Sequence, residues 1–146
     1  LLYGQPESGK TTLGKLLADH LDTPFIIDGD EFRRMFANKN YGKEGREENI
    51  RNANAVATYL NKKGNDIVIS LVNPYKHLRD VLRQNNIGRH DDWLRYEVVE
   101  VLLQSDRELR KEYHVEDFEE GTPDYTMNTD RSVEDSWSEL VKKARD

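Results

Sequence analysis

Apolar residues are grouped along the chain in short runs that alternate with stretches of helical spacing. The runs predict strands at Leu1–Tyr3, Phe25–Ile27, Asp66–Val72, Glu97–Leu103 and Tyr125–Asn128. Consecutive apolar residues, without strict alternation, are typical of parallel strands that are covered on both faces. The pattern therefore favours a buried parallel sheet.

Between these runs, apolar side chains recur every three or four residues, which is the spacing of one helical face. Helices are predicted over Lys10–His20, from the Asp28-Gly29-Asp30 turn through Met35, over Arg46–Lys63 and Tyr75–Gln84, and after Ser132, where Ser132 and Asp135 resemble a capping box. The alternation predicts an α/β fold with a mostly parallel sheet and helices on both faces. No repeat or linker interrupts it, so we expect one domain over residues 1–146. Because the chain opens in mid-strand without Met, we expect the beginning of the first strand to be missing.

Composition and charge exclude several classes of protein and of binding site. The 146 residues include 22 basic and 28 acidic side chains, a net charge of −6, with +3 over residues 1–90 and −9 over residues 91–146. This acidity argues against nucleic-acid backbone binding, although a small anionic ligand suits the first half. No run is long enough for a membrane span, and the absence of cysteine excludes disulfide scaffolds, zinc–thiolate and iron–sulfur sites. Without a visible signal peptide, we expect a cytoplasmic location.

The strongest chemical motif lies near the N-terminal end. Residues 4–11 match G-x-x-x-x-G-K-[ST] and stand between a predicted strand and a predicted helix, as that motif requires. The two glycines permit backbone angles that a Cβ would block, so that N–H groups turn inward around a phosphate. Lys10 is placed to reach the outer phosphates of a nucleotide, and the Thr11 hydroxyl to ligate Mg²⁺. The predicted phosphate contacts are Gly4, Gln5, Pro6, Glu7, Ser8, Gly9, Lys10, Thr11 and Thr12, with the Glu7 carboxylate, which repels phosphate, turned to solvent.

A second motif, Asp28-Gly29-Asp30, follows a predicted strand at the edge where open α/β sheets bind ligands. Arg33 shares a helical face with Asp30. The pair offers a carboxylate to accept a proton and a guanidinium to hold an anion. A strand-end turn with an N-cap is the alternative interpretation.

Two more segments are candidates for contact with a ligand. Arg46 and Asn49 share a face at the predicted start of a long helix, where the alternative is ordinary surface polarity. Asn73-Pro74 stands directly after a strand, where the alternative is a simple strand-end turn.

Taken in order, these segments resemble the adenylylsulfate kinase family, a branch of the P-loop kinases. The resemblance covers roughly residues 1–80 and 125–146 and rests on Gly4–Leu13, Asp28–Arg33, Arg46–Arg51, Pro74–Lys76 and Asn128–Asp130. It implies the three-layer P-loop NTPase fold, use of ATP and Mg²⁺, and a small-molecule acceptor. It also implies transfer of the γ-phosphoryl group to the 3′-hydroxyl of adenylylsulfate, in sulfate assimilation. Family members often form homodimers.

The resemblance also implies roles for individual residues. Asp30 would be the catalytic carboxylate, with Lys10 serving ATP. Tyr41 would pack on the acceptor's adenine, and Thr129 would lie near the adenine of ATP. The residues expected to contact the acceptor are Asp28, Arg33, Tyr41, Arg46, Asn49 and Asn73.

Residues 104–124 depart from the family pattern. This region is shorter than the family's lid and lacks its Arg-Asp-Pro-Lys-Gly-Leu-Tyr stretch, and Asn73 replaces the usual Ser. Arg107, Arg110 and Lys111 are candidates for lid charges, and Phe118 or Tyr113 for the ring that clamps the acceptor's base. Two alternatives stay open: a kinase of another nucleoside, nucleotide or sugar hydroxyl, and a non-catalytic ATP-binding module. A GTPase is disfavoured because Asn61–Gly64 fails the Asn-Lys-x-Asp motif.

Overall fold

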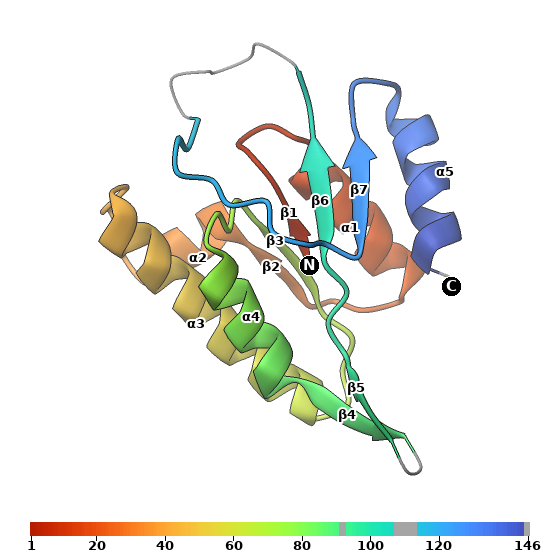
Figure 1. Ribbon diagram of the computed structural model, residues 1–146, viewed down its shortest axis with the longest axis horizontal. Coiled ribbons are helices and arrows are strands. Elements are labelled where there is room, and N and C mark those ends of the chain that lie inside the picture. Colours follow the sequence, from red (N-terminus) through yellow and green to blue (C-terminus); the bar gives the residue numbers. More distant parts are fainter. Residues whose placement is uncertain (91–92, 107–113, 145–146) are drawn as a thin grey trace.

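A five-stranded sheet forms the centre of the computed structural model, which describes residues 1–90, 93–106 and 114–144. Its strands lie in the order β2-β3-β1-β6-β7, and all four pairings are parallel. The bounds are β1 Leu2–Tyr3, β2 Ile26–Asp28, β3 Val68–Leu71, β6 Val101–Gln104 and β7 Tyr125–Asn128. The predicted parallel sheet is confirmed, and β1, the first strand in the chain, occupies its middle (Figure 1).

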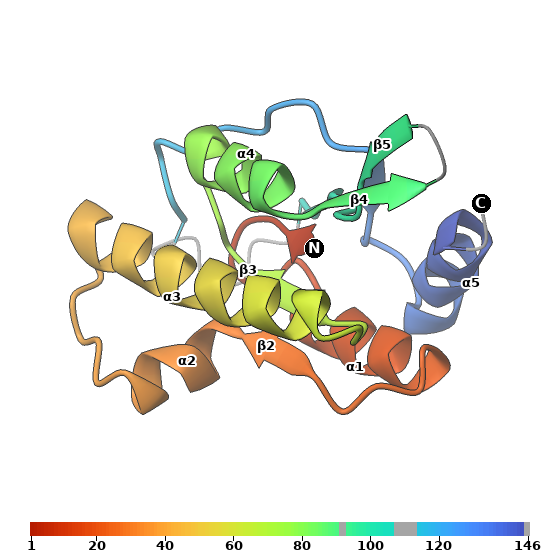
Figure 2. The ribbon, with the colours of Figure 1, turned by 90° about the horizontal axis from the view of Figure 1, so that it is seen from below.

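Helices cover both faces of the sheet, as Figure 2 shows. They are α1 Lys10–His20, α2 Gly29–Met35, α3 Lys43–Lys62, α4 Lys76–Asn85 and α5 Val133–Ala144. One apolar cluster joins Ile27, Ile69 and Leu71 of the sheet to α3 and α4. The opposite cluster joins Val68, Val101 and Met127 to α1 and α5. Alternate strand residues point to opposite faces, so Val68 and Ile69 enter different cores and the fold has three layers.

One element was not predicted. Strands β4 Ile87–His90 and β5 Trp93–Tyr96 pair antiparallel in a hairpin of their own. The hairpin projects beyond the end of α4, away from the sheet's carboxyl edge (Figure 1). The prediction of a strand over Glu97–Leu103 was wrong at its start, because residues 97–100 lead from this hairpin to β6, which begins at Val101.

The long helix begins earlier than predicted. Its first residue is Lys43, after Gly42 in extended backbone, so Arg46 lies in its first turn and Asn49 in its second. Gly45 explains the difference, since the loop before α3 passes directly over its first turn. A Cβ at position 45 would stand 1.7 Å from the backbone oxygen of Asn40. A residue that reads as a loop glycine thus permits close packing of loop on helix.

Candidate active site

The predicted site residues gather around one cavity at the carboxyl edge of the sheet. This cavity, of about 1170 Å³, extends from the loop between β1 and α1 to the first turns of α2 and of α3. Among the predicted residues, it is lined by Pro6, Glu7, Gly9, Lys10, Thr11, Thr12, Asp28, Asp30, Arg33, Tyr41, Arg46, Asn49 and Asn73. Residues of four segments far apart in the sequence therefore share one site.

The loop of residues 4–9 has the backbone that its glycines predict. Gly4 has φ 159°, and a Cβ there would stand 2.3 Å from the backbone oxygen of Leu103 in β6. Glu7 has φ 65°, an uncommon angle for a residue with a side chain. Glu7 is exposed, as expected, although it also lines the cavity. The loop is thus drawn tightly against the sheet and carries one strained acidic residue.

Lys10 lies at the first turn of α1 and is only 9% exposed. Its Nζ donates hydrogen bonds to the backbone oxygen of Gln5 at 2.8 Å and to Ser8 Oγ at 3.3 Å. Burial lowers the pKa of Lys10 to about 8, and the nearby carboxylates of Asp30 and Asp28 oppose that shift. The ammonium group is therefore held in a desolvated position where an added phosphate would favour its charged form.

Thr11 and Asp28 meet across the cavity floor. Thr11 Oγ1 donates to Asp28 Oδ1 at 3.2 Å. The other carboxylate oxygen, Oδ2, accepts from the backbone N–H of Glu31 at 3.2 Å and so caps the N-terminus of α2. Both interpretations of this segment hold, since Asp28 is an N-cap and also faces the phosphate-binding loop. Asp30, two residues on, is exposed and lines the same cavity.

These residues fit a magnesium-bound nucleotide. A hydroxyl and a carboxylate oxygen are the hard oxygen ligands that Mg²⁺ prefers. They adjoin a loop whose backbone can approach phosphate closely and whose lysine is already inside the cavity. Thr11 and Asp28 are the residues that would hold the cation.

Two arginines line the opposite half of the cavity. Arg33 Nη1 donates to the backbone oxygen of Asn40 at 2.9 Å, and its guanidinium lies 4.3 Å from the ring centroid of Tyr41. Arg46 donates to the Tyr75 hydroxyl at 3.0 Å and to the backbone oxygen of Tyr41 at 2.9 Å. Tyr41 is 70% exposed, so its other face is open to a stacked base. Cationic groups and an open ring thus stand together, as an anionic nucleotide requires.

Two asparagines in this half carry buried polar atoms that have no partner among the described residues. Asn49 Nδ2 donates to the backbone oxygen of Gly29 at 3.2 Å, which leaves Oδ1 unpaired within the described chain. Asn73 is 1% exposed, and neither of its side-chain polar atoms has a partner among the described residues. Its φ of 44° is in the left-handed region that Asn tolerates better than most residues. Unpaired buried amides beside a cavity are unusual and are often completed by a ligand or water.

Four residues predicted to contact the nucleotide lie outside the cavity lining: Gly4, Gln5, Ser8 and Thr129. The Thr129 hydroxyl donates to the backbone oxygen of Ser8 at 2.8 Å and is 3% exposed. Gln5 turns its side chain to the backbone of Val115. That Thr129 lies near the adenine of ATP stays a prediction.

The structure adds site residues that the sequence did not indicate. His114 and Val115 line the cavity, and Tyr75 holds Arg46. His114 and Val115 carry no motif and reach the site only because the chain returns across it. Tyr75 lies in the Pro74–Lys76 segment, for which no role in holding Arg46 was predicted. The suggestion that Phe118 clamps the acceptor was wrong, since its ring stacks on Tyr3 with centroids 6.2 Å apart and stands outside the cavity lining. The other lid candidates, Arg107, Arg110, Lys111 and Tyr113, lie outside the described residues.

Two structural classes of feature are absent from the described residues. No helix there is long and apolar enough to cross a membrane. No group of three or more acidic, histidine or cysteine side chains in that part of the chain could hold a metal ion.

Comparison with known proteins agrees with this geometry. A probable adenylyl-sulfate kinase of Pyrococcus abyssi is 34% identical over 110 residues, which cover 72% of this chain and 63% of that protein. A cytidine diphosphoramidate kinase of Campylobacter jejuni is 25% identical over 112 residues, covering 74% of this chain and 66% of that protein. The chain thus spans less than two thirds of the length of either relative. A Mycobacterium tuberculosis APS kinase, solved with AMPPNP and APS, superposes with a TM-score of 0.79 at 20% identity and covers 99% of this chain and 95% of its own.

A family model identifies the family directly. The model described as adenylylsulphate kinase matches residues 1–118, well over half of the chain. The matched stretch includes the phosphate-binding loop, the Asp28–Asp30 turn, both arginines and Asn73. The chain therefore belongs to the adenylylsulphate kinase family.

Proposed function

We propose that the protein is an ATP-dependent kinase that transfers the γ-phosphoryl group to a hydroxyl, with the 3′-hydroxyl of adenylylsulfate as the acceptor. One observation carries the proposal. A single cavity is lined by the phosphate-binding residues Lys10 and Thr11 and also by Asp30, Arg33 and Arg46. A donor and an acceptor bound there would be in contact.

Some of the cavity residues would bind the two substrates and others would act in the transfer step. The loop N–H groups and the ammonium of Lys10 hold the triphosphate and stabilise charge that develops during transfer. Asp30 orients the acceptor hydroxyl and takes its proton as the oxygen attacks. Arg33 and Arg46 hold the anionic end of the acceptor, while the exposed ring of Tyr41 receives its base. Catalysis of this kind is mostly positioning and electrostatics.

Magnesium, when bound beside Thr11 and Asp28, would neutralise phosphate charge. Lys10 would contact the outer phosphates. Thr11 and Asp28, which are hydrogen-bonded to each other in the cavity lining, would hold the cation. Thr129 supports the loop through its bond to Ser8.

Three observations favour a second candidate acceptor. The Campylobacter jejuni relative is named for a cytidine nucleotide, and residues 104–124 lack the lid stretch of the adenylylsulfate kinases. Position 73 also carries an amide with two unpaired polar atoms where that family usually has Ser. These features favour a nucleotide acceptor with a different base as the alternative.

The test is a γ-phosphoryl transfer assay with ATP and Mg²⁺. Adenylylsulfate is run beside cytidine 5′-diphosphoramidate and a panel of nucleosides, nucleotides and sugars, with Lys10→Ala as the inactive control. Transfer to adenylylsulfate that disappears in the control supports the proposal. Transfer to another panel member alone assigns that acceptor instead, and ATP binding without any transfer indicates a binding-only protein.

A further inference from the structure

Residues 114–120 cross the carboxyl edge of the sheet and are called the strap here. Figure 1 shows the strap within the blue segment that leads from the grey trace toward β7. It begins at the cavity, which His114 and Val115 line, and ends beside α4. It contacts both halves of the site on the way.

At the nucleotide end, the strap is held by Gln5 of the phosphate-binding loop. Gln5 Nε2 donates to the backbone oxygen of Val115 at 2.8 Å, and the Val115 N–H donates to Gln5 Oε1 at 2.9 Å. One side-chain amide thus satisfies both polar groups of one strap residue, as a neighbouring strand would. Val115 is buried, so the loss of these bonds would leave its backbone unpaired away from water.

In its middle, the strap reaches the predicted acceptor site. Asp117 Oδ1 lies 3.5 Å from Arg46 Nη2. The other guanidinium nitrogens of Arg46 donate to Tyr75 and Tyr41. The Asp117 carboxylate therefore completes the set of contacts that fixes the orientation of Arg46.

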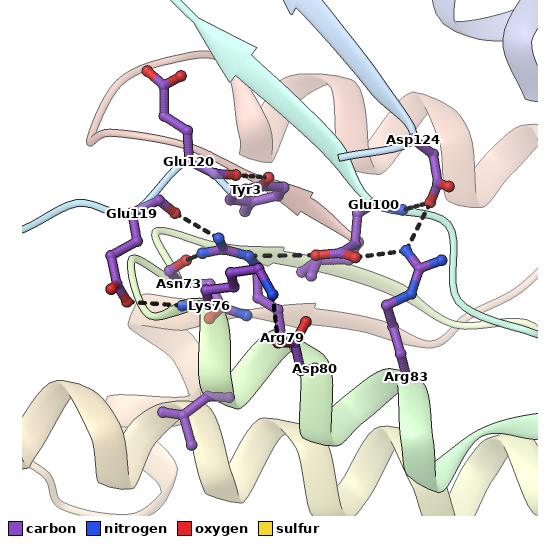
Figure 3. A network of polar contacts seen from close by, with 12 residues as sticks. Tyr3, Asn73, Lys76, Arg79, Asp80, Arg83, Glu100, Glu119, Glu120 and Asp124 are labelled. Atoms are coloured by element: carbon purple, nitrogen blue, oxygen red, sulfur yellow. Dashed lines mark hydrogen bonds and ion pairs between the residues drawn. The ribbon is translucent and has the colours of Figure 1, made fainter. Parts of the chain in front are cut away.

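At the far end, the strap is anchored without any help from Gln5. The Glu119 N–H donates to the backbone oxygen of Pro74 at 2.8 Å, and Glu119 Oε1 accepts from the N–H of Lys76 at 3.0 Å. Arg79 donates to the Glu119 backbone oxygen, and the Tyr3 hydroxyl donates to that of Glu120 at 2.6 Å (Figure 3). The far end would stay in place if the end near the cavity were released.

We propose that Gln5 is a positioning residue for the acceptor. By holding Val115 it sets the strap against the cavity and, through Asp117, fixes the guanidinium of Arg46. This inference rests on the proposed function only in taking the Arg46 half as the acceptor's half. The nucleotide half is spared, because phosphates contact the backbone of the loop and Lys10, and the Gln5 side chain points away from them to Val115.

The variant Gln5→Ala tests this separation of the two halves. With ATP and adenylylsulfate, the KM for adenylylsulfate should rise about tenfold, the effect of losing roughly 1.4 kcal/mol of hydrogen bonding. The KM for ATP should change less than about twofold. Gln104→Ala is the matched control, because it removes a glutamine contact to the strap at exposed Glu120 and should change neither constant.

An unchanged KM for adenylylsulfate, or an equal rise in both constants, would overturn the proposal. A second variant guards against misfolding of the first. Asp117→Asn should also raise the KM for adenylylsulfate, because it weakens the contact between the strap and Arg46. In the double variant, the loss of acceptor binding free energy should be smaller than the sum of the two single losses, because both substitutions act through the strap. Fully additive losses would contradict the inference that Gln5 and Asp117 both act on the acceptor through the strap.

Hydrogen exchange separates failure of this inference from failure of the proposed function. If the wild-type protein transfers nothing to adenylylsulfate, the proposed acceptor is wrong, but the strap is still testable. Faster amide exchange at residues 115–117 in Gln5→Ala than in Gln104→Ala supports the hold of Gln5 on the strap. Equal exchange in the two variants overturns it, whatever the acceptor.

Discussion

The hydroxyl of Thr11 and the carboxylate of Asp28 share a hydrogen bond of 3.2 Å, although one residue opens α1 and the other ends β2. The bond joins the phosphate-binding loop to the turn that carries Asp30. It places two oxygen ligands at the point where a phosphate-bound cation would sit.

Thr11→Val should therefore weaken the use of magnesium more than the binding of nucleotide. The substitution keeps the shape of the side chain and removes Oγ1, so the Mg²⁺ concentration needed for half-maximal turnover should rise about tenfold or more. Turnover against Mg²⁺ at fixed ATP measures this. Thr126→Val, at an exposed position of β7, is the control and should leave the curve unchanged.

Lys10 makes nucleotide binding depend on pH in the alkaline range. Its pKa of about 8 in the free protein means that the ammonium loses its proton as pH rises from 7 to 9. Bound phosphate favours the charged form, so ATP affinity should fall over that range and binding at pH 8.5 should take up a proton. Calorimetry in two buffers of different ionisation enthalpy measures the uptake. Lys10→Arg, which stays charged, should show no such uptake from this position.

The same shift has a consequence for stability. The folded-state pKa of Lys10 lies below its unfolded value of 10.5. Between about pH 8 and pH 10.5 this side chain therefore binds fewer protons in the folded chain than in the unfolded chain. This group then makes the free energy of unfolding rise with pH across that window, and the burial of its charge is costly below it.

Asp30→Asn should reduce turnover strongly while it leaves ATP binding nearly intact. The amide cannot take a proton from the acceptor, and Asp30 is exposed at the cavity wall, so the fold should tolerate the change. The expected loss in kcat is about 10²–10⁴-fold, the usual size for a missing general base. Normal turnover with bound acceptor would show that another group receives the proton.

Glu7→Gly should raise ATP affinity and also stabilise the fold. Glycine adopts the φ of 65° without strain, for a net gain of about 0.5–1 kcal/mol, and removes a carboxylate from beside the phosphates. Ala37→Gly is the matched control, since Ala37 is exposed at φ 51° and lies outside the cavity lining. Both variants should raise Tm, but only Glu7→Gly should lower the Kd for ATP. A Kd that does not move would mean that the carboxylate avoids the phosphates.

Arg79→Met should destabilise the protein substantially. Arg79 is 1% exposed, forms an ion pair with buried Glu100 at 3.3 Å and donates to the backbone oxygen of Asn73 at 2.7 Å (Figure 3). Arg83 still pairs with Glu100 at 2.6 Å, so we expect a loss near the lower end of the range of about 3–5 kcal/mol for broken buried pairs. Chemical denaturation measures it. Arg51→Met, which breaks an exposed pair with Glu47, should cost under about 0.5 kcal/mol.

Local patterns predicted the parts of this fold that depend on neighbours in sequence. The phosphate-binding loop and the Asp28–Asp30 turn follow from adjacent residues, and both lie as expected. The hairpin of β4 and β5 was missed because its strands pair with each other outside the sheet, where no continuous apolar run is required.

The contacts of the strap could not be predicted in the same way. Gln5 and Val115 are 110 residues apart in the sequence, and Arg46 and Asp117 are 71 apart. A backbone carbonyl carries no residue type that a motif can contain, so nothing in the sequence around position 5 indicates its partner. Only the folded arrangement brings these groups together.

The central place of β1 sets an order on the folding of this chain. Leu2 pairs with Ser70 on one side and with Val101 on the other, although β1 precedes both partner strands in the sequence. Its edges stay unsatisfied until β3 and then β6 have been synthesised, and such distant pairings make folding slow. During that interval β1 carries unpaired backbone on both sides, so a chain that contains β1 but lacks β6 should aggregate more readily than one that contains both partner strands.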